Sequence, residues 1–266
     1  MLIFPTYQTL ITKPVAAAGG GDSDSSGFIE TNLFSHWDAG NSNSYSGSGS
    51  TLTDLSGNSN DGTLKNTSNI SYSSSNNGHL VFSTTATTDK PWIWRTTDYI
   101  KDVEEDDYTI ELWVNLYYPG GNKLLWRNTP PTAGFPENKA IYVYNGKMRV
   151  SDWFTGTGTN TKGSWTYLDS SAQYTSGEYA GWEHLVFSRI GTGNDNAKFY
   201  RNNSLIHTWT NKVDWDRTNS ATDTRRSSFG NGMRGKFAIY RFYLGTGLTS
   251  SQVTTNYNVD KSRFGL

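Results

Sequence analysis

Few acidic residues in this chain stand where an enzyme would need them. Hydrolysis of a glycosidic bond uses two carboxyl groups that flank the bond, roughly 5 to 9.5 Å apart. The most regular strand pattern, residues 108–118, carries a single acid, Glu111. A second group is contiguous, so it predicts a solvated turn rather than an alternating acid pair or a metal site: Glu104, Glu105, Asp106 and Asp107. The acidic residues therefore favour a protein that is not an enzyme.

The four histidines do not form a nucleophilic site by pattern. His36, His79, His184 and His207 each stand alone in an expected strand, and no Gly-x-Ser-x-Gly motif accompanies them. We interpret them as structural or edge residues. The glycine-rich stretch 156–163 lacks the Gly-Lys-Ser/Thr ending of a phosphate-binding loop, so we interpret it as an ordinary loop.

Oxygen-bearing side chains near the first expected strand could hold a calcium ion, because a hard cation prefers carboxylate, amide and carbonyl oxygens. The candidates are Asp38, Asp54, Asn58 and Asn60, with Asp54 the best single ligand. Their spacing differs from that of an EF-hand loop. The alternative is that these residues only make Asx turns. A structural calcium is thus the one cofactor that the sequence suggests.

Tryptophan side chains give the remaining candidate chemistry, because a flat apolar ring can stack on a sugar. The candidates for carbohydrate binding are Trp92, Trp94, Trp153 and Trp165, and Trp113 is a further one. Aromatic residues this numerous also build cores and interfaces. The segment 211–226 mixes arginines and acids around Trp215, a composition suited to a polar rim around an aromatic anchor or to a solvated loop.

Composition bounds the protein class. The chain has 266 residues, a formal net charge of -1, 10 Trp, 16 Tyr and no Cys. Such a charge argues against nucleic-acid binding, which is usually marked by a basic footprint. Disulfides and thiolate metal sites are excluded. No apolar run reaches the roughly 20 residues that cross a bilayer, so no membrane association is expected. Aromatic and β-branched residues between Gly, Asn and Ser turns predict an all-β domain.

Alternating patterns place the strands that must position these side chains. In 108–118 the expected core face is Ile110, Leu112, Val114 and Leu116. Both faces of 236–243 are apolar or aromatic, which predicts a closing strand covered on both sides, and we expect the first strand, near 33–37, to lie beside it. Asn145-Gly146 predicts a tight hairpin. Residues 154–179 are expected to be a long loop. Thr249 and Gln252 form a capping box, so a helix should begin there. The other expected strands are 29–39, 79–83, 92–95, 123–127, 181–190, 197–201 and 205–209.

The order of these segments resembles the laminin-G-like, concanavalin A-like jelly roll found in virion proteins of tailed phages, notably marine and cyanobacterial ones. The segments that carry the resemblance are 33–40, 54–64, 108–114, 181–189, 236–258 and the terminal 261–266. The resemblance implies an antiparallel two-sheet β-sandwich over residues 28–266, with a short C-terminal helix. It also implies that an enzyme of this fold would carry a Glu-x-Asp-x-x-Glu strand, as laminarinase-like members do. The chain has no such strand.

Residues 1–27 stand apart from the resemblance. Their first half is apolar (Leu2, Ile3, Phe4, Tyr7, Leu10, Ile11), and their second half is a flexible linker by composition. We interpret them as an extended arm that docks on other virion proteins, the alternative being an edge strand of the same domain. The expected protein is a multicopy virion-surface protein that decorates a capsid or forms part of a fibre or tail, with a host polysaccharide as its ligand. The alternatives are a secreted or cell-surface bacterial lectin-like module and a divergent glycoside hydrolase.

Overall fold

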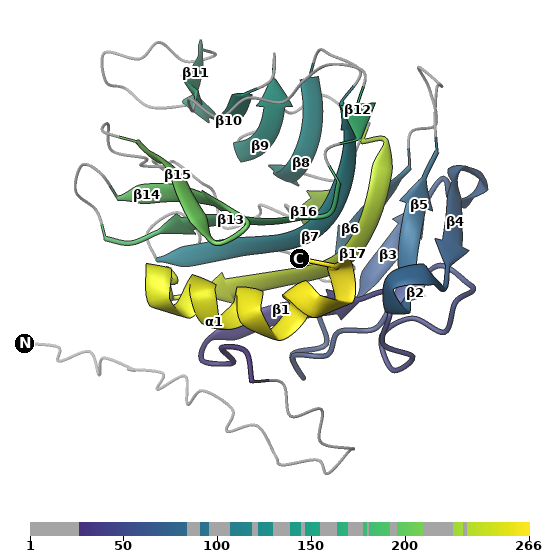
Figure 1. Ribbon diagram of the computed structural model, residues 1–266. Helices are drawn as coiled ribbons and strands as arrows, with labels where there is room; N and C mark the ends of the chain where they lie inside the picture. Colours follow the sequence, from purple (N-terminus) through teal and green to yellow (C-terminus); the bar gives the residue numbers. More distant parts are fainter. Residues whose placement is uncertain are drawn as a thin grey trace, which may run out of the picture.

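The structure is a computed structural model (Figure 1). It describes residues 27–83, 91–95, 107–118, 122–129, 139–144, 147–154, 164–169, 178–179, 181–191, 196–209, 226–230 and 233–266. The predicted arm and linker are residues 1–27, of which 1–26 lie outside these ranges, and so does most of the segment 211–226. The boundary between arm and domain therefore stays a prediction.

Two antiparallel sheets form the domain. Sheet A has the order β15 (Ser204–Trp209), β14 (Ala197–Arg201), β13 (Glu183–Arg189), β7 (Tyr108–Tyr118), β17 (Gly235–Leu244), β5 (His79–Phe82) and β4 (Ile70–Ser73). Beside this path, β1 (Leu33–Asp38) pairs with β17, and β12 (Glu178–Tyr179) pairs with β7. Sheet B has the order β11 (Ser164–Asp169), β10 (Lys147–Phe154), β9 (Lys139–Tyr144), β8 (Asn122–Thr129), β16 (Arg226–Phe229), β6 (Trp92–Arg95), β3 (Gly62–Lys65) and β2 (Thr51–Leu52).

The core lies between the sheets, as the period-two patterns predict. Ile110, Leu112, Val114 and Leu116 of β7 are buried there with Phe187 of β13, which confirms the expected core face. Residues at alternate positions of the sheet B strands are buried in the same core: Ile93, Trp126, Ile141, Val143 and Met148. Apolar burial of this extent is the main stabilising contribution to such a domain. The all-β, two-sheet sandwich is thus confirmed.

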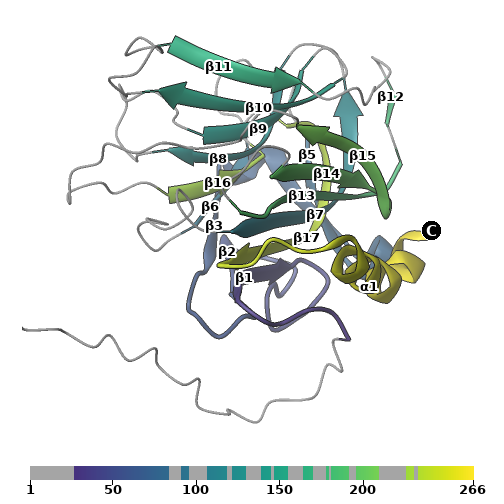
Figure 2. The same cartoon turned by 90° about the vertical axis from the view of Figure 1, so that its left-hand side faces the viewer.

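The outer face of sheet A is covered by the C-terminal helix α1 (Ser250–Asp260), which lies against β17 in both views (Figures 1 and 2). Thr249 accepts a hydrogen bond from the Gln252 amide, and Gln252 Oε1 accepts one from the Thr249 amide, so the predicted capping box is formed. Val253 is fully buried against Val186 and Tyr243. The helix therefore closes the second face of β7 and β17, which explains why both faces of 236–243 are apolar.

Two expectations about strands need correction. The alternation of β17 is broken by a bulge between Phe237 and Ile239, so Phe237 and Tyr240 share the core face and Ile239 lies on the helix side. An extra residue in one strand shifts the parity of every position after it. The stretch 154–179 is also not one long loop, because β11 and β12 lie within it.

Short helical turns complete the described chain: η1 (Thr67–Asn69), η2 (Ser75–Asn77) and η4 (Lys261–Phe264). The last of these returns the C-terminus to the outer face of sheet A. There the Phe264 ring stacks on Trp113, with ring centroids 4.4 Å apart. The first strand, β1, pairs with β17 as the sequence predicted, from Leu33 opposite Tyr243 to Asp38 opposite Ile239. The two ends of the domain therefore meet on one sheet.

Candidate functional site

Glu111, the one acid of its strand, is enclosed between sheet A and α1. Its Oε1 accepts hydrogen bonds from Arg241 NH1 and lies 2.9 Å from His184 Nε2, and its Oε2 accepts one from Asn256 Nδ2 at 2.6 Å. Arg241 in turn donates to both oxygens of Asp260 at the end of α1. The carboxyl group has no solvent exposure. A ligand cannot reach it, and its chemistry is structural.

Electrostatics agrees with that role. Burial alone would raise the pKa of Glu111, but the Arg241 charge and the hydrogen bonds from His184 and Asn256 outweigh it and lower the pKa to about 2. The carboxylate therefore stays ionised at neutral pH. Trp113 lies beside it, fully buried, and donates from Nε1 to Asp260. Trp113 is thus excluded as a platform for a sugar ring in this fold.

The histidines are distributed through the packing rather than gathered. His184 stacks on Trp113, His79 packs edge-on against Trp182, and His36 packs edge-on against Phe28. Burial, followed by the Arg241 charge, holds the pKa of His36 well below its usual value, so this ring is neutral at physiological pH. His207 is partly buried beside Trp209 on the edge strand β15. These surroundings fit the interpretation of the histidines as structural or edge residues.

The loop with the calcium candidates protects the free edge of β1. Asp54 Oδ1 accepts from the amides of His36 and Ser56, and Oδ2 accepts from the Asn60 amide and the Ser56 hydroxyl. The Asn58 and Asn60 amide groups donate to Phe34 O. Loop side chains thus occupy the hydrogen-bonding groups that an edge strand would otherwise expose.

Asp38 also has a partner within the chain. Both of its oxygens accept from Arg263 NH1 at 2.9 Å, and Oδ1 also accepts from the Gly40 amide. A Cβ at Gly40 would lie 1.8 Å from Asn77 O and 2.3 Å from Arg263 NH2, so this junction requires glycine. Among the described residues, no group of three or more acids and histidines is arranged to hold a metal ion. The N–H and O–H donors fill the directions from which calcium would bind Asp54, and the calcium site stays a prediction.

The aromatic candidates fare differently, because Trp92 and Trp94 lie on the outer face of sheet B. Ile93 between them is fully buried in the core, whereas both tryptophans are half-buried. Their ring centroids are 4.6 Å apart, and the ring planes are inclined at 50°. Opposite them on β3 stand Lys65, which pairs with Trp92, and Thr63, which pairs with Trp94. The strand thus presents two adjacent rings beside a hydroxyl and an exposed cation.

Trp153 and Trp165 occupy positions of the same face, further along sheet B. They are cross-strand partners in the register of β10 and β11. On β10, position 153 is an even number of residues from the half-buried Arg149, so both positions belong to the face away from the core. Met148, next to Arg149, belongs to the core face. The four tryptophans that the sequence suggested thus come from three strands of one sheet, at register positions of one parity.

A row of register partners connects these strands. Ser228 of β16 pairs with Trp94, and Arg127 of β8 pairs with Ser228. The row continues through Ala140 of β9 and Ser151 of β10 to Tyr167 of β11. In the middle of the row, Ser228 and Ala140 are small and buried, and Arg127 stands between them. Sequence reasoning missed Thr63, because only the pairing of distant segments places it beside the tryptophans.

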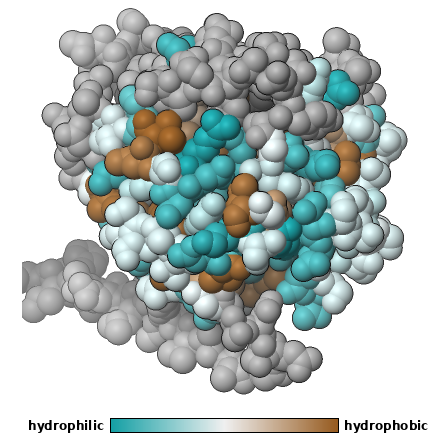
Figure 3. Space-filling view, viewed as in Figure 1, coloured by the Kyte–Doolittle hydropathy of each residue, from teal (hydrophilic) through white to brown (hydrophobic). Residues whose placement is uncertain are grey.

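The face of the molecule that carries α1 is a weaker candidate for a binding surface. On the face that carries α1, hydrophobic residues form small separate patches among hydrophilic ones (Figure 3). The large apolar residues exposed in the described chain come from different elements: Tyr72, Ile190, Leu205, Val259 and Leu266. Scattered residues of this kind do not indicate a partner surface. Within the described residues no helix is long and apolar enough to cross a membrane.

Comparison with known proteins gives structural likeness without sequence likeness. No family model matches the chain, and no curated protein matches it. Among solved structures, it is similar to the binding domain of botulinum neurotoxin DC in complex with rat synaptotagmin II, with a TM-score of 0.64 and 10% identity over 87% of this chain. The likeness shows the fold. The chain spans 52% of that domain's length.

Two further similar structures are described as complexes with a sugar. One is the same kind of domain, the binding domain of botulinum neurotoxin DC in complex with SialylT, at a TM-score of 0.62 and 11% identity, covering 87% of this chain and 52% of that one. The other is domain 4 of an extracellular arabinanase from Geobacillus stearothermophilus in complex with arabinotriose. Its TM-score is 0.57 and its identity 19%, and the match covers 85% of this chain and 98% of that domain.

Proposed function

We propose that this protein is a carbohydrate-binding β-sandwich whose ligand site is the outer face of sheet B. The observation that carries the proposal is the Trp92–Trp94 pair, two half-buried rings 4.6 Å apart on one strand. Half-buried rings lose little conformational entropy on binding and present an apolar face to the C–H groups of a sugar. Thr63 and Lys65 supply polar groups at the rim of the pair.

The mechanism is binding without chemistry. Glu111, the acid on which a hydrolase would depend, is held inside the network with Arg241 and Asp260. The similarity to domains solved with SialylT and with arabinotriose supports a sugar ligand through the fold alone. The sandwich then serves as a rigid scaffold, because its core and helix fix the positions of the strands that carry the rings.

The test is affinity electrophoresis through gels that contain soluble polysaccharides, followed by calorimetry on any that retard the protein. Trp92→Ala and Trp94→Ala are each expected to weaken binding at least about tenfold, which corresponds to about 1.4 kcal/mol. Tyr72→Ala is the matched control, because Tyr72 is an exposed aromatic residue on β4 of the other sheet. Circular dichroism establishes that each variant is folded. Equal binding by all three variants would rule out this face.

The placement of this protein on a virion is a more specific part of the proposal, and the support for it comes from the sequence alone. The resemblance to tailed-phage virion proteins and the composition of residues 1–27 support a surface protein that its arm anchors in several copies. The extracellular alternative, a bacterial lectin-like module, uses the same face and requires no arm. Both place the sandwich where polysaccharides of a cell surface are within reach.

A further inference from the structure

The charged residues at outer register positions of sheet B are mostly basic, although the whole chain is nearly neutral. The formal net charge is -1. In the described strands of sheet B, the register positions on the side away from the core include one acidic residue, Asp169, which is the cross-strand partner of Arg149. The basic residues at positions of this parity come from four strands: Lys65, Arg127, Lys147, Arg149 and Arg226. Positive charge and aromatic rings are thus placed on the same side of one sheet.

Two of these cations have no acidic partner within the described ranges. Lys65 is exposed and Lys147 half-buried, and neither makes an ion pair with any residue of the described chain. Three arginines elsewhere are paired with acids: Arg241 with Glu111 and Asp260, Arg201 with Glu183, and Arg263 with Asp38. Lys198 and Lys236 of sheet A likewise make no ion pair with a described residue, so Lys65 is distinguished by its place beside Trp92 rather than by a missing counter-charge.

The spacing fits a polymer. Lys65 lies on β3 and Lys147 on β10, with β6, β16, β8 and β9 between them. Five intervals of about 4.8 Å place these strands about 24 Å apart. A monosaccharide at Trp92 would reach Lys65 but not Lys147. A longer chain that crosses the strands would span the tryptophan pair and both cations, passing over Ser228 and Ala140, whose side chains are buried.

We infer that the ligand of this face is an acidic polysaccharide, in which sugar rings stack on Trp92 and Trp94 while carboxylate or sulfate groups meet Lys65 and Lys147. The inference rests on the proposed function and specifies its ligand class. A nucleic acid would also supply rings and negative charge. We favour the polysaccharide because the fold is similar to that of domains solved with SialylT and with arabinotriose, and a nucleic acid is one outcome of the test below.

The test compares polymers that share a backbone and differ in charge. The probes are polygalacturonate and its methyl ester, carboxymethyl cellulose and hydroxyethyl cellulose, and dextran sulfate and dextran. At least one acidic polymer is expected to bind about tenfold or more tightly than its neutral partner. Because screening shortens the range of charge interactions, the affinity should fall several-fold between 50 and 500 mM salt, two concentrations between which the screening length changes about threefold.

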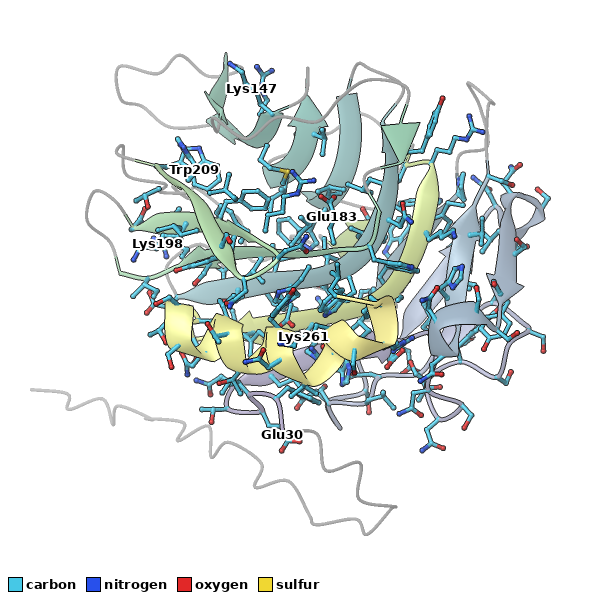
Figure 4. All side chains as sticks on the ribbon, viewed as in Figure 1. Glu30, Lys147, Glu183, Lys198, Trp209 and Lys261 are labelled. Carbon is cyan, nitrogen blue, oxygen red and sulfur yellow. The ribbon has the colours of Figure 1, made fainter. Side chains whose placement is uncertain are left out.

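Charge variants locate the contact. Lys65→Gln with Lys147→Gln is expected to lower the affinity for the acidic polymer several-fold and to flatten its salt dependence. Lys198→Gln is the control, because Lys198 lies on β14 in sheet A, away from Lys147 in sheet B (Figure 4). An unaltered affinity in the double variant would overturn the inference.

The remaining outcomes separate the two proposals. Equal binding to the neutral partner would overturn the acidic ligand and leave a carbohydrate-binding face. Failure of all six polymers to bind would overturn both proposals. Binding of a single-stranded dT oligomer as tightly as the best polymer would replace the glycan by a nucleic acid.

Discussion

At the scale of single residues, Glu111 shows how burial changes the meaning of an acid. In the sequence it stands between Thr109 and Trp113, where a glycosidase could carry one of its two acids. In the fold it pairs with Arg241 and accepts from Asn256 behind sheet A. A lone buried carboxylate would be strongly destabilising, and these donors offset the loss of hydration.

Replacement of this acid should therefore affect stability. Glu111→Gln removes the charge that Arg241 faces and leaves the buried guanidinium with Asp260 alone. We expect a loss of about 3 kcal/mol in the free energy of unfolding, measured by urea denaturation. Glu30→Gln, at an exposed position, is the control. A loss below about 0.5 kcal/mol, the range of ordinary surface substitutions, would contradict the structural role.

At the scale of elements, the loop from Asp54 to Asn60 acts as an edge cap. Antiparallel strands normally satisfy their outer backbone groups with another strand or with solvent. Here the amide of His36 donates to Asp54, the carbonyl of Phe34 accepts from Asn58 and Asn60, and the carbonyl of His36 accepts from the Leu55 amide. The loop thus prevents another chain from pairing with β1.

Asp54→Ala separates this role from calcium binding. Loss of four hydrogen bonds to a largely buried carboxylate is expected to lower the unfolding free energy by about 2 to 3 kcal/mol. The hydrogen-bond role predicts the same loss in calcium and in a chelator. A calcium role predicts that wild-type Tm rises with added calcium and that the variant alone fails to respond. Thermal scans of both proteins in both buffers decide between the two.

At the scale of the whole molecule, two buried acids set the pH range of stability. Burial raises the pKa of Glu183 to about 7 from 4.5, against the opposing charge of Arg201. A raised folded-state pKa means that its contribution is complete below about pH 4.5 and is lost as pH rises through 7. The pKa of Glu111 is about 2, so its contribution is complete above about pH 4.5 and is lost as pH falls toward 2.

Stability should therefore peak near pH 5 and decline toward pH 8. The slope attributable to Glu183 is at most about 1.4 kcal/mol per pH unit, the value for one proton. Urea denaturation at several pH values measures it. Glu183→Gln should flatten the decline between pH 5 and 8 while leaving the acid side intact. A decline that persists unchanged in this variant would assign the pH dependence to another group.

The arm belongs to the same scale, since it is expected to connect the sandwich to other proteins. Deletion of residues 1–20 should leave the Tm of the domain unchanged, because the described contacts of the N-terminal part begin at Phe28 and Ile29. The deletion should abolish incorporation into particles, measured by the protein content of purified virions. Normal incorporation would show that anchoring lies elsewhere.

Local signals could be predicted from the sequence. The core face of β7, the capping box at Thr249 and Gln252 and the pairing of Leu33–Trp37 with the closing strand were expected before the fold was known, and all three are present. Each depends on side-chain periodicity or on hydrogen bonds between near neighbours. The bulge in β17 and the strands within 154–179 escaped prediction, since no local pattern distinguishes them from regular strand or loop.

The sequence by itself determined the strands, the all-β class and the aromatic and polar residues worth testing. Only the tertiary structure decided which of these residues face a ligand. Glu111 and Trp113 are enclosed because α1, far along the chain, covers their side of β7, and Asp54 is occupied because its loop lies along β1. Trp92 and Trp94 come to the outer face, half-buried, because the pairing of β6 with residues 62–65 and 226–229 fixes Ile93 in the core. Such pairings join segments far apart in sequence, and no local pattern encodes them.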